Sequence, residues 1–195
     1  MRVKARVVLR TAAAMAFLAM GAGAAQAKTV RWAASGDPNT MDPHSQNVGT
    51  VTMVLQQVYD SLLTRTQDLS LAPGLATEWH QEEPTRWRFV LRQGVKFHEG
   101  ETLTAEDVAF SVQRALLPTS NFGIYVDTVD RAVAVDERTV DIILKRPDPI
   151  LPNKLASIFI MSKSWSEKNN AARPQHTRAR EEMLARFSPS RSTAM

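Results

Sequence analysis

The chain has 195 residues, a length that suits one domain of ordinary size or a fragment of a larger protein. It contains no cysteine, which excludes disulfides, thiolate metal sites, cysteine nucleophiles and a lipoprotein anchor. The formal net charge of +4 comes from the two ends, because residues 28–162 carry 13 basic and 17 acidic side chains. This central part shows no basic patch with interleaved aromatic residues, so we expect no nucleic-acid partner.

Residues 1–27 have the order of a secretory signal peptide. A basic stretch precedes an apolar segment over residues 11–24, and Ala25-Gln26-Ala27 forms an Ala-x-Ala cleavage signal. Cleavage after Ala27 would make Lys28 the mature N-terminus. The apolar segment is shorter than the roughly 20 residues of a transmembrane helix, although an uncleaved anchor is the alternative. We therefore expect a periplasmic protein whose signal peptide has been removed.

The first part of the mature chain predicts a strand, a loop and a helix. A short strand is expected over residues 29–34. Residues 35–44 predict an ordered loop, because two Asp-Pro pairs and a glycine oppose helix formation. Residues 49–62 predict a helix, and residues 69–73 predict a further loop. The apolar face of that helix would carry Val51, Val54, Leu55, Val58 and Leu62.

The next stretch alternates bulky apolar residues with arginines, which indicates a half-buried strand. Its apolar members are Trp87, Phe89 and Leu91. Residues 95–97 predict a second extended segment. A helix follows, with Thr104 as its N-cap and Asp107 in the position of a capping box. Residues 119–127 then predict a polar loop.

The last predicted elements are a β-hairpin, a short helix and a strand. The hairpin is expected over residues 129–135 and 139–144, because apolar and polar residues alternate there. A short helix is expected over residues 151–157 and a strand over residues 158–161. From about Arg173 the composition changes to a sequence rich in arginine and serine.

The run from Trp87 to Val108 resembles the signature of the family 5 extracellular solute-binding proteins. Those proteins are the peptide, dipeptide and nickel receptors of ATP-binding cassette importers. The residues that carry the resemblance are Trp87-Arg88-Phe89, Leu91-Arg92, Gly94-Val95-Lys96-Phe97-His98, Gly100 and Leu103-Thr104-Ala105-Glu106-Asp107-Val108. The loop over residues 35–44 and the segment Leu75–Trp79 also resemble the family.

The resemblance implies an α/β fold of the class II periplasmic-binding-protein type, an incomplete clamshell. Residues 28–60 would begin lobe one, residues 61–161 would form an accessory α/β domain, and residues 162–195 would be a truncated tail. A frameshift or early stop would explain the composition of that tail, and a divergent genuine C-terminus is the alternative. The loop before the first helix would lie at the mouth of the ligand cleft, which implies four cleft-edge residues: Gln46, Asn47, Val48 and Gly49. The alternative is that these residues only cap the helix.

Motifs for catalysis or metal binding are missing from the sequence. The four histidines form no His-x-x-x-His or His-Glu-x-x-His pattern: His44, His80, His98 and His176. There is no Gly-x-Ser-x-Gly nucleophile elbow and no phosphate-binding glycine loop. We therefore expect neither an enzyme nor a cofactor. The tryptophans are expected in the core or at a domain seam, and an apolar ligand pocket is the alternative: Trp32, Trp79, Trp87 and Trp165.

These observations predict the periplasmic substrate-binding component of an ATP-binding cassette importer for peptides or similar solutes. Its partners would be the solute and the membrane permease subunits. One alternative is a secreted hydrolase, for which the sequence offers no nucleophile with a base and an orienting group. Another is a non-functional fragment. We expect the 195-residue chain not to bind ligand at physiological affinity, because a clamshell site needs contacts from both lobes.

Overall fold

The computed structural model describes residues 38, 40–174 and 189–190, all within one compact unit that spans Ala34–Met195. The predicted signal peptide with its cleavage site at Ala27 and Lys28 lies outside the described residues. The predicted strand over residues 29–34 and most of the sequence after residue 174 lie outside them as well. The division into residues 28–60, 61–161 and 162–195 stays a prediction.

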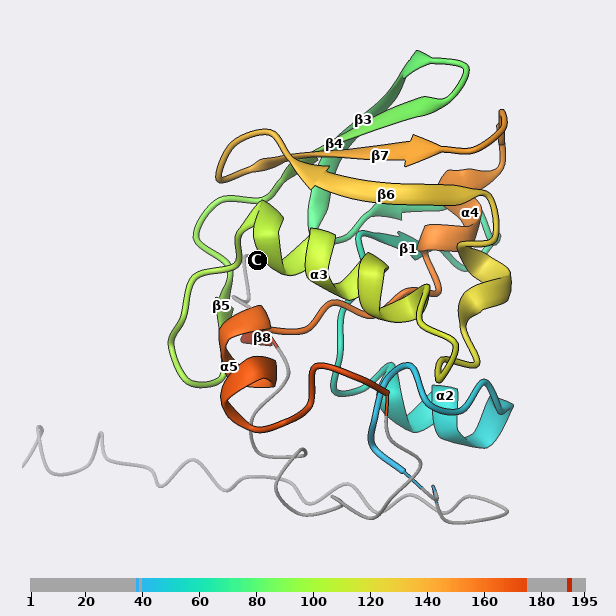
Figure 1. Cartoon of the computed structure of the whole chain (residues 1–195). Coiled ribbons are helices and arrows are strands. Elements are labelled where there is room, and N and C mark those ends of the chain that lie inside the picture. Colours follow the sequence, from blue (N-terminus) through green and yellow to red (C-terminus); the bar gives the residue numbers. More distant parts are fainter. Residues whose placement is uncertain (1–37, 39, 175–188, 191–195) are drawn as a thin grey trace, which may run out of the picture. The chain divides into compact units, whose positions relative to one another are not determined.

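The centre of the described part is a four-stranded antiparallel sheet with the strand order β3-β4-β7-β6. Its strands are β3 (Ala76–Glu83), β4 (Arg86–Leu91), β6 (Val129–Ala134) and β7 (Thr139–Leu144). Helix α3 (Ala105–Ala115) lies across one face of this sheet and contacts β6 and β7 (Figure 1). The fold is therefore mixed α/β, as predicted.

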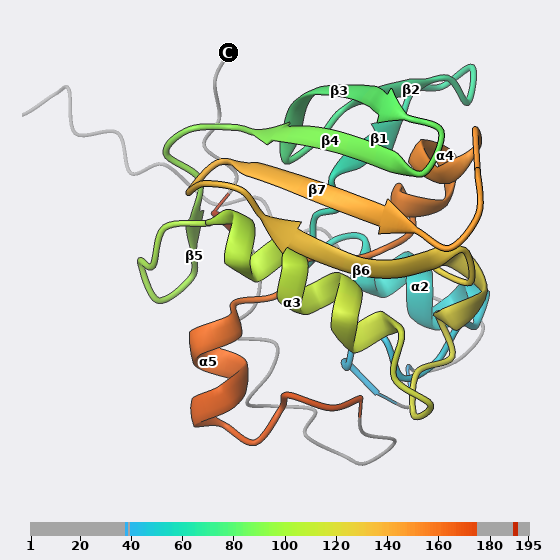
Figure 2. The same cartoon turned by 45° about the horizontal axis from the view of Figure 1, so that its top comes forward.

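Shorter elements surround the sheet and α3 (Figure 2). Two further strand pairs join β1 (Leu63–Arg65) to β2 (Leu71–Pro73) and β5 (Lys96–Phe97) to β8 (Pro189–Ser190). The remaining helices are α2 (Gly49–Leu55), the 3-10 helix η1 (Gly123–Tyr125), α4 (Leu151–Leu155) and α5 (Lys163–Lys168).

The core forms between the apolar face of the sheet, on which every second strand residue lies, and the apolar face of α3. Phe89 on β4 pairs with Val140 on β7, and Trp87 pairs with Ile142, so these side chains share the inner face of the sheet. The apolar face of α3 is buried with them: Val108, Val112 and Ala115. The strand predicted from alternation and the predicted helix are both confirmed.

The opposite face of the sheet explains why arginines alternate with the apolar residues of β4. Arg88 lies opposite Asp141 of β7, and its Nε and Nη2 donate to the two carboxylate oxygens at 2.7 Å each. Arg86 donates to Glu83 at 2.6 Å across the β3–β4 turn. Paired charges thus occupy the face that α3 does not cover.

The predicted capping box at the start of α3 is confirmed, and it does more than cap the helix. The backbone N–H of Thr104 donates to Oδ2 of Asp107 at 2.9 Å. Oδ1 of Asp107 also accepts the backbone N–H of Lys163 at 2.8 Å, which fixes the start of α5 beside α3. Trp165 of α5 is buried, so the chain just after residue 161 packs on the core.

The helix predicted over residues 49–62 is wrong beyond Leu55. After α2 the chain makes a turn in which Gln57 N–H donates to Val54 O at 3.0 Å. It then leaves the helical path, because the Asp60 carbonyl accepts the N–H of Ile160 at 2.9 Å and Ser61 pairs with Phe159. Leu62 is buried as predicted, but from an extended segment.

Two other predictions need correction. Residues 71–73, expected in a loop, form β2 and pair with β1, so only Leu69 and Ser70 of that segment lie in the turn. The strand expected over residues 158–161 is reduced to the single bridge from Phe159 to Ser61. All four residues of that run are buried, and a short apolar run cannot by itself distinguish a strand from another buried segment.

The tryptophan side chains that the structure describes belong to the core or pack against it. Trp165 is buried, while Trp79 and Trp87 are partly buried against the core. The Nε1 of Trp87 donates to the Asp148 carbonyl at 3.3 Å. Trp32 lies outside the described residues. The prediction of structural tryptophans is therefore confirmed for these three.

Gly74 lies at a close backbone crossing and gives a test of the fold. A Cβ added there would lie 2.7 Å from the carbonyl oxygen of Ser61 and 2.9 Å from that of Leu62. We expect Gly74→Ala to lower the free energy of unfolding by about 1–3 kcal/mol in urea titrations, because backbone atoms must move. Gly49→Ala is the matched control, since no atom lies within 4 Å of its added Cβ. Equal stability of the two variants would contradict this crossing.

Candidate functional site

The loop over residues 40–48, which leads into α2, is held from the inside by a buried ion pair. The Nη1 and Nη2 of Arg114 donate to the two carboxylate oxygens of Asp42 at 2.9 and 2.6 Å. The side chains of Asp42 and Arg114 are only 2% and 0% exposed. Arg114 comes from α3, so the pair ties the loop to the helix that covers the sheet. Two buried charges require this mutual pairing.

His44 is the second internal anchor of the loop. Its Nε2 lies 3.0 Å from the carbonyl oxygen of Phe159, so Nε2 carries the proton and donates. Burial, followed by the positive charge of Arg114, lowers the pKa of His44 to about 3. The ring is therefore neutral at ordinary pH, and it packs against Phe122 with ring centroids 5.8 Å apart.

Backbone carbonyls of the same loop are bound by side chains from two other segments. The Tyr59 hydroxyl donates to Met41 O at 3.1 Å. The Ser120 hydroxyl donates to His44 O at 3.1 Å, and the Asn121 amide donates to the carbonyl of Ser45 at 2.6 Å. These contacts fix the course of the loop, so the residues that follow it have a defined position.

The structure places the four predicted cleft-edge residues at the surface, next to one another at the start of α2. Gln46 is half-buried, and Asn47, Val48 and Gly49 are exposed. Val48 is the N-cap of α2 and makes no side-chain hydrogen bond to it. The alternative, that these residues only cap the helix, therefore finds no side-chain hydrogen bond at Val48 and otherwise stays open. Their position at the edge of a ligand cleft stays a prediction.

The segment over residues 119–127, predicted from the sequence to be a polar loop, contributes to this surface. The hydroxyl of Tyr125, at the end of η1, lies 3.4 Å from both the Nδ2 and the Oδ1 of Asn47. The two residues are 78 positions apart in the chain. No local pattern signals such a contact, because it depends on how η1 packs under the loop.

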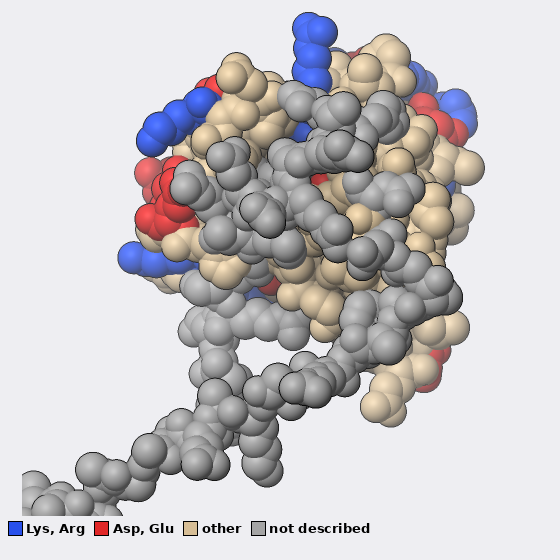
Figure 3. Space-filling model, turned by 90° about the horizontal axis from the view of Figure 1, so that it is seen from below, with Lys and Arg blue, Asp and Glu red and all other residues tan. Residues whose placement is uncertain are grey.

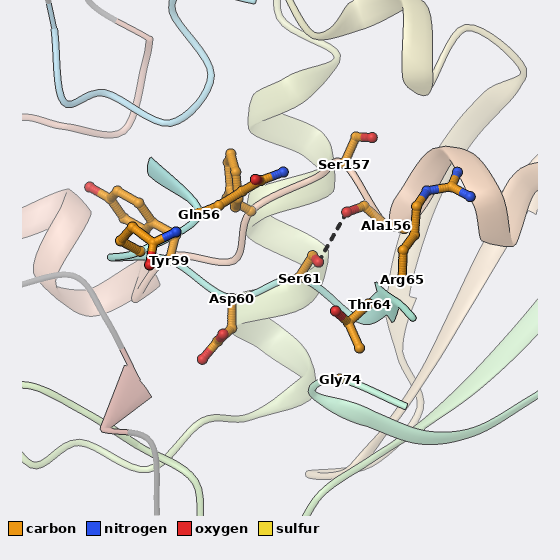
Figure 4. A pocket seen from close by; sticks show the side chains of 11 residues that line it. Gln56, Tyr59, Asp60, Ser61, Thr64, Arg65, Gly74, Ala156 and Ser157 are labelled. Carbon is orange, nitrogen blue, oxygen red and sulfur yellow. Dashed lines mark hydrogen bonds between the residues drawn. The ribbon is translucent and has the colours of Figure 1, made fainter. Parts of the chain in front are cut away.

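A polar pocket with a volume of about 390 Å³ lies at the other end of α2 (Figure 4). The hydroxyl of Ser61 joins its walls by donating to the carbonyls of Leu63 and Ala156 at 2.6 and 3.1 Å. The guanidinium of Arg65 is already bound to Leu69 O and Asn153 O at 3.2 Å each. The pocket therefore offers amides and hydroxyls more than charges, and its other polar side chains include Gln56, Gln57, Asp60, Thr64 and Ser157.

Charged side chains lie mainly along the margins of the face seen in Figure 3, and the surface between them is largely uncharged where it is visible. Over the described ranges, no group of three or more carboxylates and histidines could hold a metal ion. The described helices are all too short or too polar to cross a bilayer.

Residues 70–179 match the family described as bacterial extracellular solute-binding proteins, family 5 middle. The match covers more than half of the chain and includes the sheet, α3 and α5.

A curated relative is the HTH-type transcriptional regulator SgrR of Escherichia coli O6:K15:H31 (strain 536 / UPEC). It is 33% identical over 124 residues, which are 62% of this chain and 22% of the regulator. The matched part of the chain spans about a fifth of the length of the curated relatives that it matches.

Two solved structures share the fold. AgaA from A. tumefaciens R10, in complex with agropinic acid, is 29% identical with a TM-score of 0.65. The likeness covers 70% of this chain and 28% of AgaA. The murein tripeptide binding protein MppA of Escherichia coli is 25% identical with a TM-score of 0.63, over 67% of this chain and 30% of MppA. The expected class of fold, a periplasmic-binding-protein clamshell represented in part, is confirmed.

Removing one charge of the buried pair tests the anchoring of the loop. We expect Asp42→Asn to lower the free energy of unfolding by about 3–5 kcal/mol, because the charge of Arg114 would remain buried without its counter-ion. Asp130→Asn, which disrupts an exposed pair with Arg131, should stay near the stability of the unmodified chain. Urea titrations of both variants would measure the difference. A mild effect at Asp42 would show that the loop does not depend on this pair.

The neutral His44 predicts that stability falls as the pH falls. Its pKa is about 3 in the fold and about 6.5 in the unfolded chain, so the unfolded chain binds more protons between these values. The free energy of unfolding should therefore drop by roughly 2–3 kcal/mol between pH 7 and pH 4.5, at about 1.4 kcal/mol per pH unit below pH 6.5. Urea titrations at several pH values would measure the slope. The variant His44→Gln should lose most of it, and an unchanged slope in that variant would contradict the assignment.

Proposed function

Because the chain belongs to the bacterial extracellular solute-binding proteins of family 5, we propose that it acts as the periplasmic substrate-binding component of an ATP-binding cassette importer. The family match over residues 70–179, joined by the likeness in fold, is the observation that carries this proposal. Its structural neighbours are binding proteins. The proposed activity is accordingly reversible binding, with no chemical change to the solute.

Peptides or similar small solutes are the proposed ligands. MppA is named for a murein tripeptide, and AgaA was solved with agropinic acid. Both neighbours support a ligand of small-molecule size. The uncharged surface around the start of α2 is compatible with the neutral part of such a molecule.

The loop before α2 gives the proposed site its rigidity. Asp42 and His44 anchor it from below, which leaves Gln46, Asn47, Val48 and Gly49 as the proposed cleft-edge residues above. A loop that is already ordered costs less conformational entropy when a ligand binds. The remaining contacts of a clamshell site would come from a second lobe that closes over this edge.

The proposed partners besides the solute are the permease subunits in the membrane, and the proposed location is the periplasm. Mass spectrometry of periplasmic material tests the location. We expect a mature protein that begins at Lys28, because Ala25-Gln26-Ala27 forms the cleavage signal. Cytoplasmic marker proteins measured in the same fractions are the control. An intact Met1, or protein found only in the cytoplasm, would contradict the proposal.

A second candidate function follows from the likeness to SgrR, whose name identifies it as a transcriptional regulator. This chain could then be the solute-sensing part of such a regulator. The proposed leader over residues 1–27 argues against that role, because export would separate the chain from DNA. The excess of acidic residues over residues 28–162 also disfavours a nucleic-acid partner.

Solute binding can be measured directly by calorimetric titration with di- and tripeptides and with agropinic acid. The described residues would supply one side of the proposed site, so we expect residues 1–195 alone to show no saturable binding near micromolar concentration. Fusion to the closing lobe of a family neighbour such as AgaA should restore saturable binding of at least one of these solutes. Micromolar binding by residues 1–195 alone would show that one side is sufficient. The absence of binding in the fusion would contradict the proposed function.

A further inference from the structure

We propose that Ile124 and Tyr125 of η1 form a second wall of the solute site and select solutes that carry an uncharged apolar side chain next to an amide group. This inference rests on the proposed function and adds to it a preference among solutes. Both residues come from a segment 70 or more positions away from the loop before α2.

The first observation is the contact between the two segments. The hydroxyl oxygen of Tyr125 lies 3.4 Å from the Nδ2 of Asn47 and 3.4 Å from its Oδ1. This distance is long for a hydrogen bond, so the contact leaves most of the capacity of both groups unused. An amide side chain has two N–H donors and an oxygen acceptor, and a phenol can both donate and accept. Together they can bind the N–H and C=O of one peptide unit.

The second observation is that this wall has a rigid support. The ring of Tyr125 packs on Phe122 with centroids 5.7 Å apart, and Phe122 is fully buried. Phe122 also packs against His44, the anchor of the loop before α2. The loop before α2 and η1 therefore share one buried aromatic support.

The third observation is that large apolar side chains flank the polar pair. Ile124 is 69% exposed and Val48 is 52% exposed. Figure 1 and Figure 2 both place the start of α2 and η1 on the same side of the described part. Contact with an aliphatic or aromatic group of the solute would remove both side chains from water, which is favourable.

The fourth observation is the absence of charge from both segments. Residues 46–49 and 123–125 include no Lys, Arg, Asp or Glu. The nearest acid along the chain, Asp127, is paired with Arg146 at 2.8 Å and Lys154 at 2.9 Å. This wall would therefore contact the neutral middle of a solute, while charged end groups bind elsewhere. A peptide with an apolar side chain fits this chemistry better than a solute that is charged or polyhydroxylated at the same point.

The test is an NMR titration of residues 1–195 with three tripeptides at millimolar concentration: Gly-Leu-Gly, Gly-Gly-Gly and Gly-Asp-Gly. Residues 46–49 and η1 alone should bind a tripeptide weakly, with a dissociation constant in the millimolar range. This is compatible with the expected absence of binding near micromolar concentration. We expect Gly-Leu-Gly to shift the methyl signals of Ile124 and Val48 and the side-chain amide of Asn47. Its dissociation constant should be about 10-fold lower than that of Gly-Gly-Gly, the size of effect that an apolar contact gives in discrimination between substrates.

Variants test whether Ile124 and Tyr125 determine the preference among the peptides, or whether any exposed apolar side chain has the same effect. Ile124→Ser should remove the preference for Gly-Leu-Gly and leave the binding of Gly-Gly-Gly unchanged. Tyr125→Phe should weaken both peptides by a similar factor, because it removes the hydroxyl only. Val135→Ser is the matched control, since Val135 is 51% exposed in the turn between β6 and β7. All variants are checked for an unchanged pattern of backbone signals.

The outcomes distinguish this inference from the function on which it rests. If no tripeptide shifts any signal of residues 46–49 or 123–125, this inference is overturned, while the proposed function is decided separately by the titration of the fusion protein. If signals shift only at residues 46–49, with equal affinity for leucine and glycine at the centre, the inference is overturned and the function stands. Shifts confined to the polar pocket beside Gln57 and Thr64 would also overturn it.

Discussion

The buried ion pair between Asp42 and Arg114 is the interaction on which the arrangement around α2 depends. It joins a loop near the start of the described chain to a helix 72 positions later, without access to water. Such a pair contributes little net stability over an apolar replacement, because desolvation offsets its attraction. What it supplies is position, since a carboxylate and a guanidinium held by two parallel hydrogen bonds permit one geometry. His44, Phe122 and α2 take their places around it.

Local chemistry explains which parts of the fold could be predicted from the sequence. The alternation from Trp87 to Leu91 and the capping box from Thr104 to Asp107 both act within a few residues, so the strand and α3 follow from the sequence. The end of α2 could not be predicted in this way. The chain leaves the helical path after Tyr59 because its backbone pairs with that of Phe159 and Ile160, and backbone groups carry no sequence signal. β2 was missed for the same reason, since its strand character comes from pairing with β1.

The candidate site likewise has a part that could be predicted from the sequence and a part that could not. The resemblance to family 5 proteins pointed to Gln46, Asn47, Val48 and Gly49, and the structure brings them together at the surface. The resemblance did not indicate a role for Tyr125 or for the polar pocket. Tyr125 reaches Asn47 only because the packing of Phe122 brings η1 there, and the pocket is assembled from three separate segments. Contacts between distant segments depend on the complete fold.

The bridge between Ser61 and Phe159 places two points of the chain in contact although 97 residues lie between them. Residues 62–158, from β1 to α4, therefore start and finish at neighbouring points of the fold. They are not an independent insert, because Arg114 of α3 binds the buried carboxylate of Asp42 and Asp107 of α3 binds the backbone of Lys163. Excision of this segment would leave the Asp42 carboxylate buried without the charge of Arg114, so the two ends that it joins depend on what lies between them.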